Sequence, residues 1–71
     1  MNWTVAENAW PQFKGRVRAR WMKFDDAQLA AIAGKRPELL KSLQSTYGIT
    51  RADAEREVRA FEARNKDFRP K

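Results

Sequence analysis

Large apolar side chains recur at three- and four-residue steps between residues 8 and 22, and this spacing most limits what the chain can fold into. The four residues are Trp10, Phe13, Val17 and Trp21. Because an α-helix turns by about 100° per residue, the spacing places all four along one side of a helix. The sequence therefore predicts a helix over about 8–22 that packs an aromatic side against a core.

The start of this helix depends on Pro11, which has no backbone N–H and whose ring would clash with the carbonyl four residues earlier. Thr4 and Glu7 have the spacing of a capping box, so one reading is a short helix from Thr4 that kinks at Pro11. In the reading that we favour, Pro11 lies in the first turn of a helix that starts near Asn8. Gly15 inside the helix costs about 1 kcal/mol relative to Ala, and a close contact with a neighbouring helix would explain it.

A second helix is indicated over about 26–33. Asp25 is a good N-cap, and Gln28 stands at the reciprocal position of a capping box. Gly34 is placed to end the helix in a left-handed conformation. The inward-facing residues are Leu29, Ile32 and Ala33.

Two more helices follow, over about 37–47 and 51–65. Pro37 suits the first turn of the former, where its missing donor does no harm, and Gly48 is placed to close that helix. Thr50 is the expected N-cap of the latter. The inward-facing residues of the two helices are Leu39, Leu40, Leu43, Tyr47, Ala54, Val58 and Phe61.

No stretch alternates apolar and polar residues as a half-buried strand does. The sequence thus predicts an all-α fold, a small four-helix bundle with helices at approximately 8–22, 26–33, 37–47 and 51–65. Residues 1–71 are expected to form a single helical domain, with residues 65–71 as a frayed, flexible C-terminal tail. Trp3 and Phe68, near the two ends, are the aromatic residues most expected to be exposed.

The chain must reach stability without covalent or metal staples. It has 71 residues with no cysteine and no histidine, and a chain of this size buries only roughly 60% of the surface that its unfolded state exposes. Disulfides are excluded, and the usual nitrogen and sulfur ligands of structural zinc are missing. Helix packing, caps or association with another copy must therefore supply the stability.

The same absences exclude Ser-His and Cys-His nucleophilic catalysis. Asp25 and Asp26 are the only adjacent carboxylates, and their place at the start of a helix explains them better as capping residues than as an acid/base pair. Gly34 and Lys35 share only Gly-Lys with a phosphate-binding loop. We expect no catalytic residue, no metal site and no cofactor, and hence no enzyme.

Positive charge is the remaining signal for recognition. Fifteen Lys and Arg against nine Asp and Glu give a formal net charge of +6, which favours anionic partners. Five of the cations gather on or just after the first long helix, with Lys14 and Arg18 on one side of the aromatic stripe and Arg16, Arg20 and Lys23 on the other. One interpretation is a solvated face whose long side chains cover the edges of aromatic rings. The other is a surface that binds nucleic acid through its phosphates, an acidic protein or a membrane surface.

The chain shows no sign of targeting or of a membrane span. The longest apolar run, residues 29–33, is far shorter than the roughly 20 residues that a transmembrane helix needs. The first residues lack the basic and apolar regions of a secretory signal. We expect a cytoplasmic protein.

Several motifs together resemble the CsbD-like family of small bacterial general stress proteins. The first is residues 8–15, which match the family's Asn-x-Trp-x-Gln-x-Lys-Gly opening. The likeness continues through residues 32–36, Leu39-Leu40, residues 47–49, 54–58 and 61–65, in the same order and spacing. The resemblance implies a bundle of four helices, made in bacteria under general stress, and it carries over no site residue. Pro11 departs from the family, in which many relatives have Lys, and so does the run of arginines at Arg16, Arg18 and Arg20, where relatives tend to mix Lys with Glu or Gln.

Two hypotheses follow. In the first, the chain is a stress-response protein without enzymatic activity, which protects or binds a partner through its folded surface. In the second, it binds nucleic acid without sequence preference through the basic residues of its first long helix. The sequence does not indicate the partner or the oligomeric state.

Overall fold

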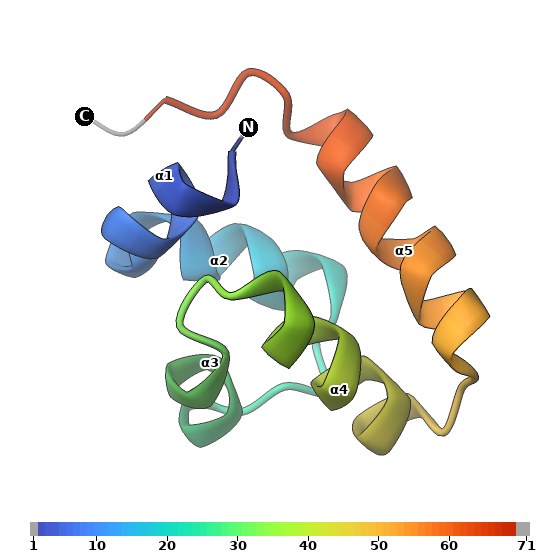
Figure 1. Cartoon of the computed structure of the whole chain (residues 1–71). Coiled ribbons are helices and arrows are strands. Elements are labelled where there is room, and N and C mark those ends of the chain that lie inside the picture. The colour runs from blue at the N-terminus through green and yellow to red at the C-terminus, as the bar shows by residue number, and fades with distance from the viewer. Residues whose placement is uncertain (1, 70–71) are drawn as a thin grey trace.

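The computed structural model describes residues 2–69, and every regular element among them is an α-helix. The helices are α1 (Trp3–Asn8), α2 (Trp10–Arg20), α3 (Asp26–Ile32), α4 (Arg36–Tyr47) and α5 (Arg51–Arg64). In Figure 1, α5 runs along one side of the molecule next to α4, and α3 lies below α2. After α5 the chain turns back across the top towards α1. The all-α prediction is confirmed.

The four-helix bundle is not confirmed, because the described residues form five helices. The expected helix over 8–22 begins at Trp10 and is preceded by the separate short helix α1. Pro11 lies in the first turn of α2, as favoured, but the chain also breaks at Ala9, which has φ −116° and ψ 33°. A continuous helix would bring the ring of Pro11 against the carbonyl of Glu7, so the chain ends one helix and starts another.

The caps of the later helices follow the prediction closely. The side chain of Asp25 accepts the Gln28 backbone N–H at 2.8 Å, and the Gln28 side chain accepts the Asp25 backbone N–H at 3.0 Å. Thr50 caps α5, and Gly48 ends α4 with φ 64°. The N-cap of α1 is Asn2 and not the expected Thr4, whose N–H donates to the Asn2 side chain at 2.7 Å.

One core joins all five helices. Phe13 is fully buried at its centre, with its ring centroid 6.1 Å from that of Trp3, 5.7 Å from Phe61 and 4.7 Å from Phe68. The other buried residues come from every helix and include nearly all of the expected inward-facing positions. They are Ala6, Ala9, Val17, Trp21, Phe24, Leu29, Ile32, Leu39, Leu40, Leu43, Ala54, Val58, Phe61 and Phe68.

The segment after α5 packs back onto the core. Phe68 is only 5% exposed and contacts Phe13 edge-on, so the expectation that it is exposed is wrong. Burying a phenylalanine contributes about 2 kcal/mol, which favours packing of this short segment against the bundle. The flexibility of residues 65–71 stays a prediction, and residues 70 and 71 lie outside the described residues.

Gly15 does not serve the role expected of it. It is exposed on α2, and a Cβ atom built there would meet no other atom within 4 Å. The anticipated close contact with a neighbouring helix is therefore absent at this position.

Candidate functional site

The basic residues of α2 divide between two flanks of the helix. Arg16 and Arg20, one turn apart, face α5 and the segment after it. Arg20 lies 2.7 Å from the Glu57 carboxylate. Arg16 donates to the Asn65 side chain at 2.9 Å, and its guanidinium lies 4.9 Å from the centroid of the Phe68 ring. These two arginines connect α2 to α5 and to the segment that follows α5.

Lys14 and Arg18 occupy the opposite flank. Arg18 lies 3.4 Å from Asp26, the first residue of α3, and both side chains are largely exposed. Lys14 is exposed and pairs with no carboxylate among residues 2–69. An exposed pair of this kind contributes less than about 1 kcal/mol, so this flank adds little to the stability of the fold.

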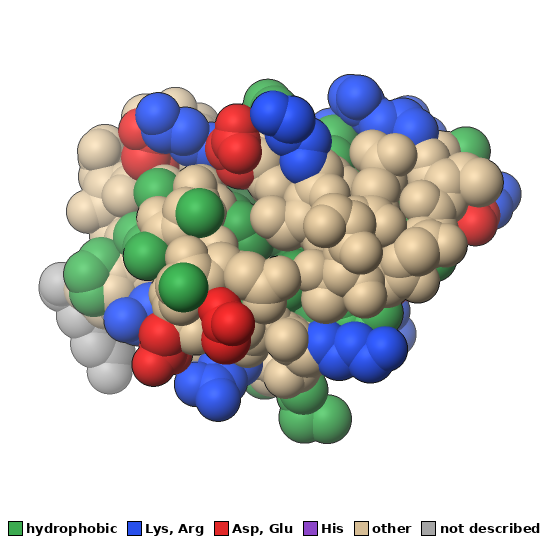
Figure 2. Space-filling model, turned by 90° about the horizontal axis from the view of Figure 1, so that it is seen from below, with side chains coloured by type: hydrophobic (Ala, Val, Ile, Leu, Met, Phe, Trp, Pro, Cys, Tyr) green, Lys and Arg blue, Asp and Glu red, His purple; other side chains and the backbone are tan. Residues whose placement is uncertain are grey.

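Lys23 lies in the turn between α2 and α3 and contacts the end of α4. Its amine is 5.1 Å from the centroid of the Tyr47 ring, and its backbone N–H donates to the Tyr47 hydroxyl at 3.3 Å. The five cations were predicted to form one candidate anion-contact surface. In the structure they lie at three places: on the two flanks of α2 and beside the end of α4. Figure 2 shows Lys and Arg at separate places round one face of the molecule, some of them beside acidic residues.

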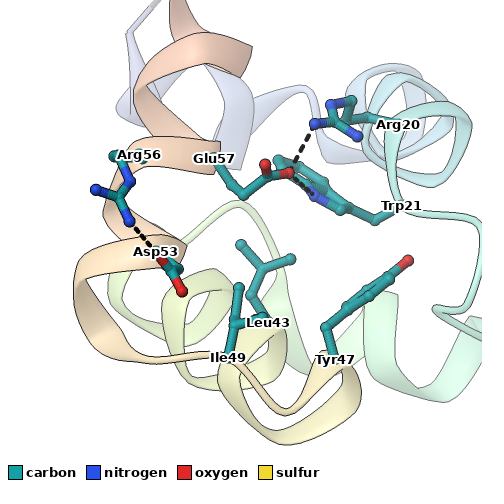
Figure 3. Close-up of a pocket in the computed structure, with 8 residues that line it drawn as sticks. All are labelled: Arg20, Trp21, Leu43, Tyr47, Ile49, Asp53, Arg56 and Glu57. Atoms are coloured by element: carbon teal, nitrogen blue, oxygen red, sulfur yellow. Dashed lines mark hydrogen bonds and ion pairs between the residues drawn. The ribbon is translucent and has the colours of Figure 1, made fainter.

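A cleft of about 380 Å³ opens where the end of α2, the end of α4 and the start of α5 meet (Figure 3). We call it the aromatic cleft. Its residues are Arg20, Trp21, Leu43, Tyr47, Ile49, Asp53, Arg56 and Glu57. Ligand-binding clefts in proteins have volumes of roughly 300–1,000 Å³, with apolar walls and a few polar groups, so this cleft has the size and lining of a binding site.

Apolar side chains form the interior of the aromatic cleft, and charges stand at its edge. In Figure 3, Leu43, Ile49 and Tyr47 face Trp21 and Glu57 across the opening. Oε1 of Glu57 accepts from Arg20 at 2.7 Å and from the indole N–H of Trp21 at 3.2 Å. Asp53 pairs with Arg56.

Sequence reasoning identified Arg20 and predicted Trp21, Leu43 and Tyr47 as core residues, but it did not find the cleft. Asp53 and Glu57 stand one turn apart on α5, and this spacing shows that they share a flank of the helix. Which residues that flank faces depends on how α2 and α4 end, and the sequence carries no signal for that.

A second depression, of about 440 Å³, lies between α1 and the start of α4. We call it the N-terminal hollow. Its residues are Trp3, Thr4, Glu7, Gly34, Lys35, Arg36, Pro37 and Glu38. Gly34 has φ 79°, and a Cβ atom built on it would lie 2.5 Å from the Cα atom of Glu7. Only glycine allows the backbone of α1 to approach so closely in this conformation. Gly34 has the expected left-handed conformation, although the C-cap of α3 is Ala33, itself left-handed with φ 49°.

Arg36 joins three helices beside the N-terminal hollow. Its guanidinium lies 2.9 Å from Glu55 and 3.1 Å from Glu62, and Glu62 also accepts the indole N–H of Trp3 at 2.6 Å. The hydrogen bond from Arg36 lowers the pKa of the Glu55 carboxyl below its ordinary value of 4.5. The same bond raises the pKa of Arg36. These polar groups are matched to one another within the fold.

Asp25 and Asp26 take up the positions expected of capping residues at the start of α3. Within residues 2–69, no three acidic side chains gather closely enough to hold a metal ion. The longest described helix has 14 residues, and no helix in this part of the chain has the length and apolar character of a membrane span.

Comparison with known proteins finds several close relatives. The chain is 42% identical over 65 residues to UPF0337 protein YjbJ of Escherichia coli strain K12, a match that covers 92% of this chain and 94% of that protein. It is 39% identical over 66 residues to UPF0337 protein ECA0631 of Pectobacterium atrosepticum, covering 93% of this chain and 96% of the relative.

UPF0337 protein NE2439 of Nitrosomonas europaea is 41% identical over 61 residues, which are 86% of this chain but only 65% of the longer relative. No protein-family model and no solved structure matches the chain. Identity of about 40% along almost the whole of two similarly sized relatives shows common descent. The chain therefore belongs to the UPF0337 family, the CsbD-like proteins.

Proposed function

We propose that this chain is a bacterial stress-response protein without enzymatic activity, which acts in the cytoplasm by binding a protein partner on its folded surface. Two lines of support stand behind the proposal. The family resemblance implies a role in general stress. The aromatic cleft supplies a surface of suitable size and chemistry.

The observation that carries the proposal is the incomplete burial of Tyr47 and Ile49 at the cleft. Both are apolar residues packed against the core, yet each keeps part of its surface open to solvent. Large apolar side chains framed by charges are typical of protein-binding surfaces, in which the apolar centre supplies affinity and the polar rim supplies specificity. A chain of only 71 residues gains stability from each large apolar side chain that it buries fully. The partial exposure of Tyr47 and Ile49 therefore suits a binding role.

Photo-crosslinking in living cells tests this proposal. A photoreactive phenylalanine derivative replaces Arg56, whose exposed side chain stands at the edge of the aromatic cleft, or Thr4, exposed at the edge of the N-terminal hollow. We expect a discrete crosslinked product of higher mass from position 56 in stressed cells and none from position 4. No product from position 56, or the same products from both positions, would contradict a partner at the cleft.

A second candidate is non-specific binding of nucleic acid, and the flank of Lys14 and Arg18 favours it. Lys14 has no carboxylate partner in the described part of the chain, and Asp26, the partner of Arg18, is itself 91% exposed in its side chain. Exchanging such a weak pair for a phosphate contact requires little energy.

Titration with mixed-sequence DNA and RNA at rising salt decides this second candidate. If the flank of Lys14 and Arg18 binds phosphates, its two contacts predict that log affinity falls with log salt at a slope near −2. Replacing Lys14 and Arg18 with Gln removes two contacts without touching α5, and we expect the slope to become shallower by about 2. An unchanged slope, or no binding at low salt, would exclude this flank as a nucleic-acid surface.

A further inference from the structure

Two apolar residues of the aromatic cleft, Tyr47 and Ile49, are only half-buried, while both of its carboxylates already have a cation beside them. Glu57 accepts from Arg20 and from the indole of Trp21 through one oxygen, and Asp53 pairs with Arg56. Each acid therefore already has an arginine beside it. The inner side of Trp21 is covered by Phe61, whose ring centroid lies 4.9 Å away. The apolar surface that the cleft offers to an entering molecule is therefore that of Tyr47 and Ile49.

The charge left at the edge of the cleft is positive. Lys23 rests over the ring of Tyr47 at 5.1 Å and, within the portion of the chain that the structure describes, has no carboxylate partner. Lys23 does not line the cleft but lies next to it at Tyr47. Together with the paired Arg20 and Arg56 it gives three cations against two carboxylates in this region, in a chain whose formal net charge is +6. Complementarity requires an occupant that is apolar in the middle and negative on its flanks.

We propose that the aromatic cleft docks an acidic segment of a partner protein. One large apolar side chain of that segment, such as phenylalanine, packs against Tyr47 and Ile49, and flanking carboxylates lie beside Lys23 and compete with Glu57 for Arg20. The inference rests on the proposed function and specifies the chemistry of the partner. The apolar anchor supplies most of the affinity, and the cations speed the encounter and select for acidic sequence.

Fluorescence anisotropy with a defined peptide tests the inference on the full chain. The probe is an end-blocked, labelled peptide, Asp-Glu-Asp-Phe-Asp-Glu-Asp, and a matched peptide has Ser in place of Phe. We expect the first to bind with a dissociation constant on the order of 10–100 µM at low salt. Losing the burial of the aromatic ring should weaken binding about tenfold.

Two charge reversals separate docking at the cleft from general attraction to a basic protein. Lys23→Glu and Lys14→Glu change the net charge equally, and neither lysine has a carboxylate partner among the described residues. We expect Lys23→Glu to weaken the Phe peptide about fivefold and Lys14→Glu less than about twofold. Both side chains are exposed, and circular dichroism confirms that each variant folds.

Equal affinity for the Phe and Ser peptides, equal losses in the two variants, or no binding at low salt would overturn the inference. Displacement of the peptide by an oligothymidylate at lower concentration would also overturn it, because it would assign the surface to nucleic acid. If position 56 crosslinks to a partner in cells while the acidic peptide does not bind, the stated chemistry fails and the proposed function stands. If neither occurs, both fail.

Discussion

The aromatic cleft and the N-terminal hollow are similar in volume, about 380 and 440 Å³, but the fold uses their side chains in opposite ways. At the hollow, the backbone of α1 packs directly against Gly34, and Arg36 forms ion pairs with two carboxylates of α5. At the cleft, the charges stand at the edge, and two apolar residues, Tyr47 and Ile49, remain half-buried. Volume alone therefore does not identify a binding site in a small bundle. The useful distinction is whether the surrounding side chains are already engaged in holding helices together.

The two glycines nearest these depressions offer the largest test of the contrast. Gly34→Ala forces a Cβ atom to within 2.5 Å of the Glu7 backbone in a left-handed conformation, and we expect it to lower the free energy of unfolding by about 3 kcal/mol or more. Gly48→Ala, beside the cleft, has φ 64° but open space, so only the conformational cost of about 1 kcal/mol remains. Urea denaturation measures both, and equal losses would show that α1 does not pack closely on Gly34.

Removing one arginine at each depression should give the next largest difference. Arg36→Gln removes the cation that lies between Glu55 and Glu62 and leaves Glu55 only its longer contact with Arg51, and we expect a loss of about 2 kcal/mol. Arg20→Gln removes a more exposed pair and should cost less than about 1 kcal/mol. The measurement is again the urea midpoint at neutral pH. A greater loss for Arg20→Gln would place the structural role at the cleft instead.

The response to acid sharpens the same contrast. Arg36 lowers the pKa of Glu55 in the folded state, so the folded chain binds this proton less readily than the unfolded chain does. The stabilisation from Glu55 is therefore complete above its ordinary pKa of 4.5 and is lost as the pH falls through the lower folded value. Glu55→Gln should lose stability at pH 7 and show a weaker pH dependence below about 4.5. Wild-type and Glu55→Gln curves that run parallel from pH 7 to pH 3 would contradict this role.

The smallest expected effect lies away from both depressions. Gly15 is an exposed helical glycine with open space around its Cα atom, so Gly15→Ala should raise the free energy of unfolding by up to about 1 kcal/mol. Thermal denaturation measures the gain. A loss of stability would show that α2 makes a close contact at this position after all. Gly15→Ala would also serve as a stabilised background in which destabilising substitutions at the cleft or at the hollow stay folded and can be compared.

Local signals were enough to predict most of this fold. A capping box such as that of Asp25 and Gln28 acts within three residues, and the apolar spacing of α2, α4 and α5 is a property of each helix alone. The favoured reading did not contain the break at Ala9, and the alternative, a short helix from Thr4, contained it only in part, because the break results from two competing effects, an early helix start and the steric demand of Pro11. Phe68 was misjudged because it stands alone after a helix, where no periodic pattern shows which way it turns.

The candidate site was harder to predict than the fold, because partners far apart in the sequence create it. The charge run on α2 is visible in the sequence, but its division between α5 and α3 depends on Glu57, Asn65 and Asp26. Likewise, Arg36 gives no local sign that it will meet Glu55 and Glu62. The sequence therefore located the cations correctly and did not reveal which of them the fold itself uses.

The three tryptophan indole groups provide the most direct test of the central claim, that the aromatic cleft binds a partner while the N-terminal hollow serves the fold. Trp21 reports on the cleft, Trp3 on the hollow and Trp10, which donates to the Leu29 carbonyl at 3.0 Å, on the core between them. A ¹⁵N–¹H NMR titration with the acidic Phe peptide follows all three signals in one sample. The account predicts a saturable shift of the Trp21 signal with those of Trp3 and Trp10 unmoved. A shift of the Trp3 signal with Trp21 unmoved would contradict it.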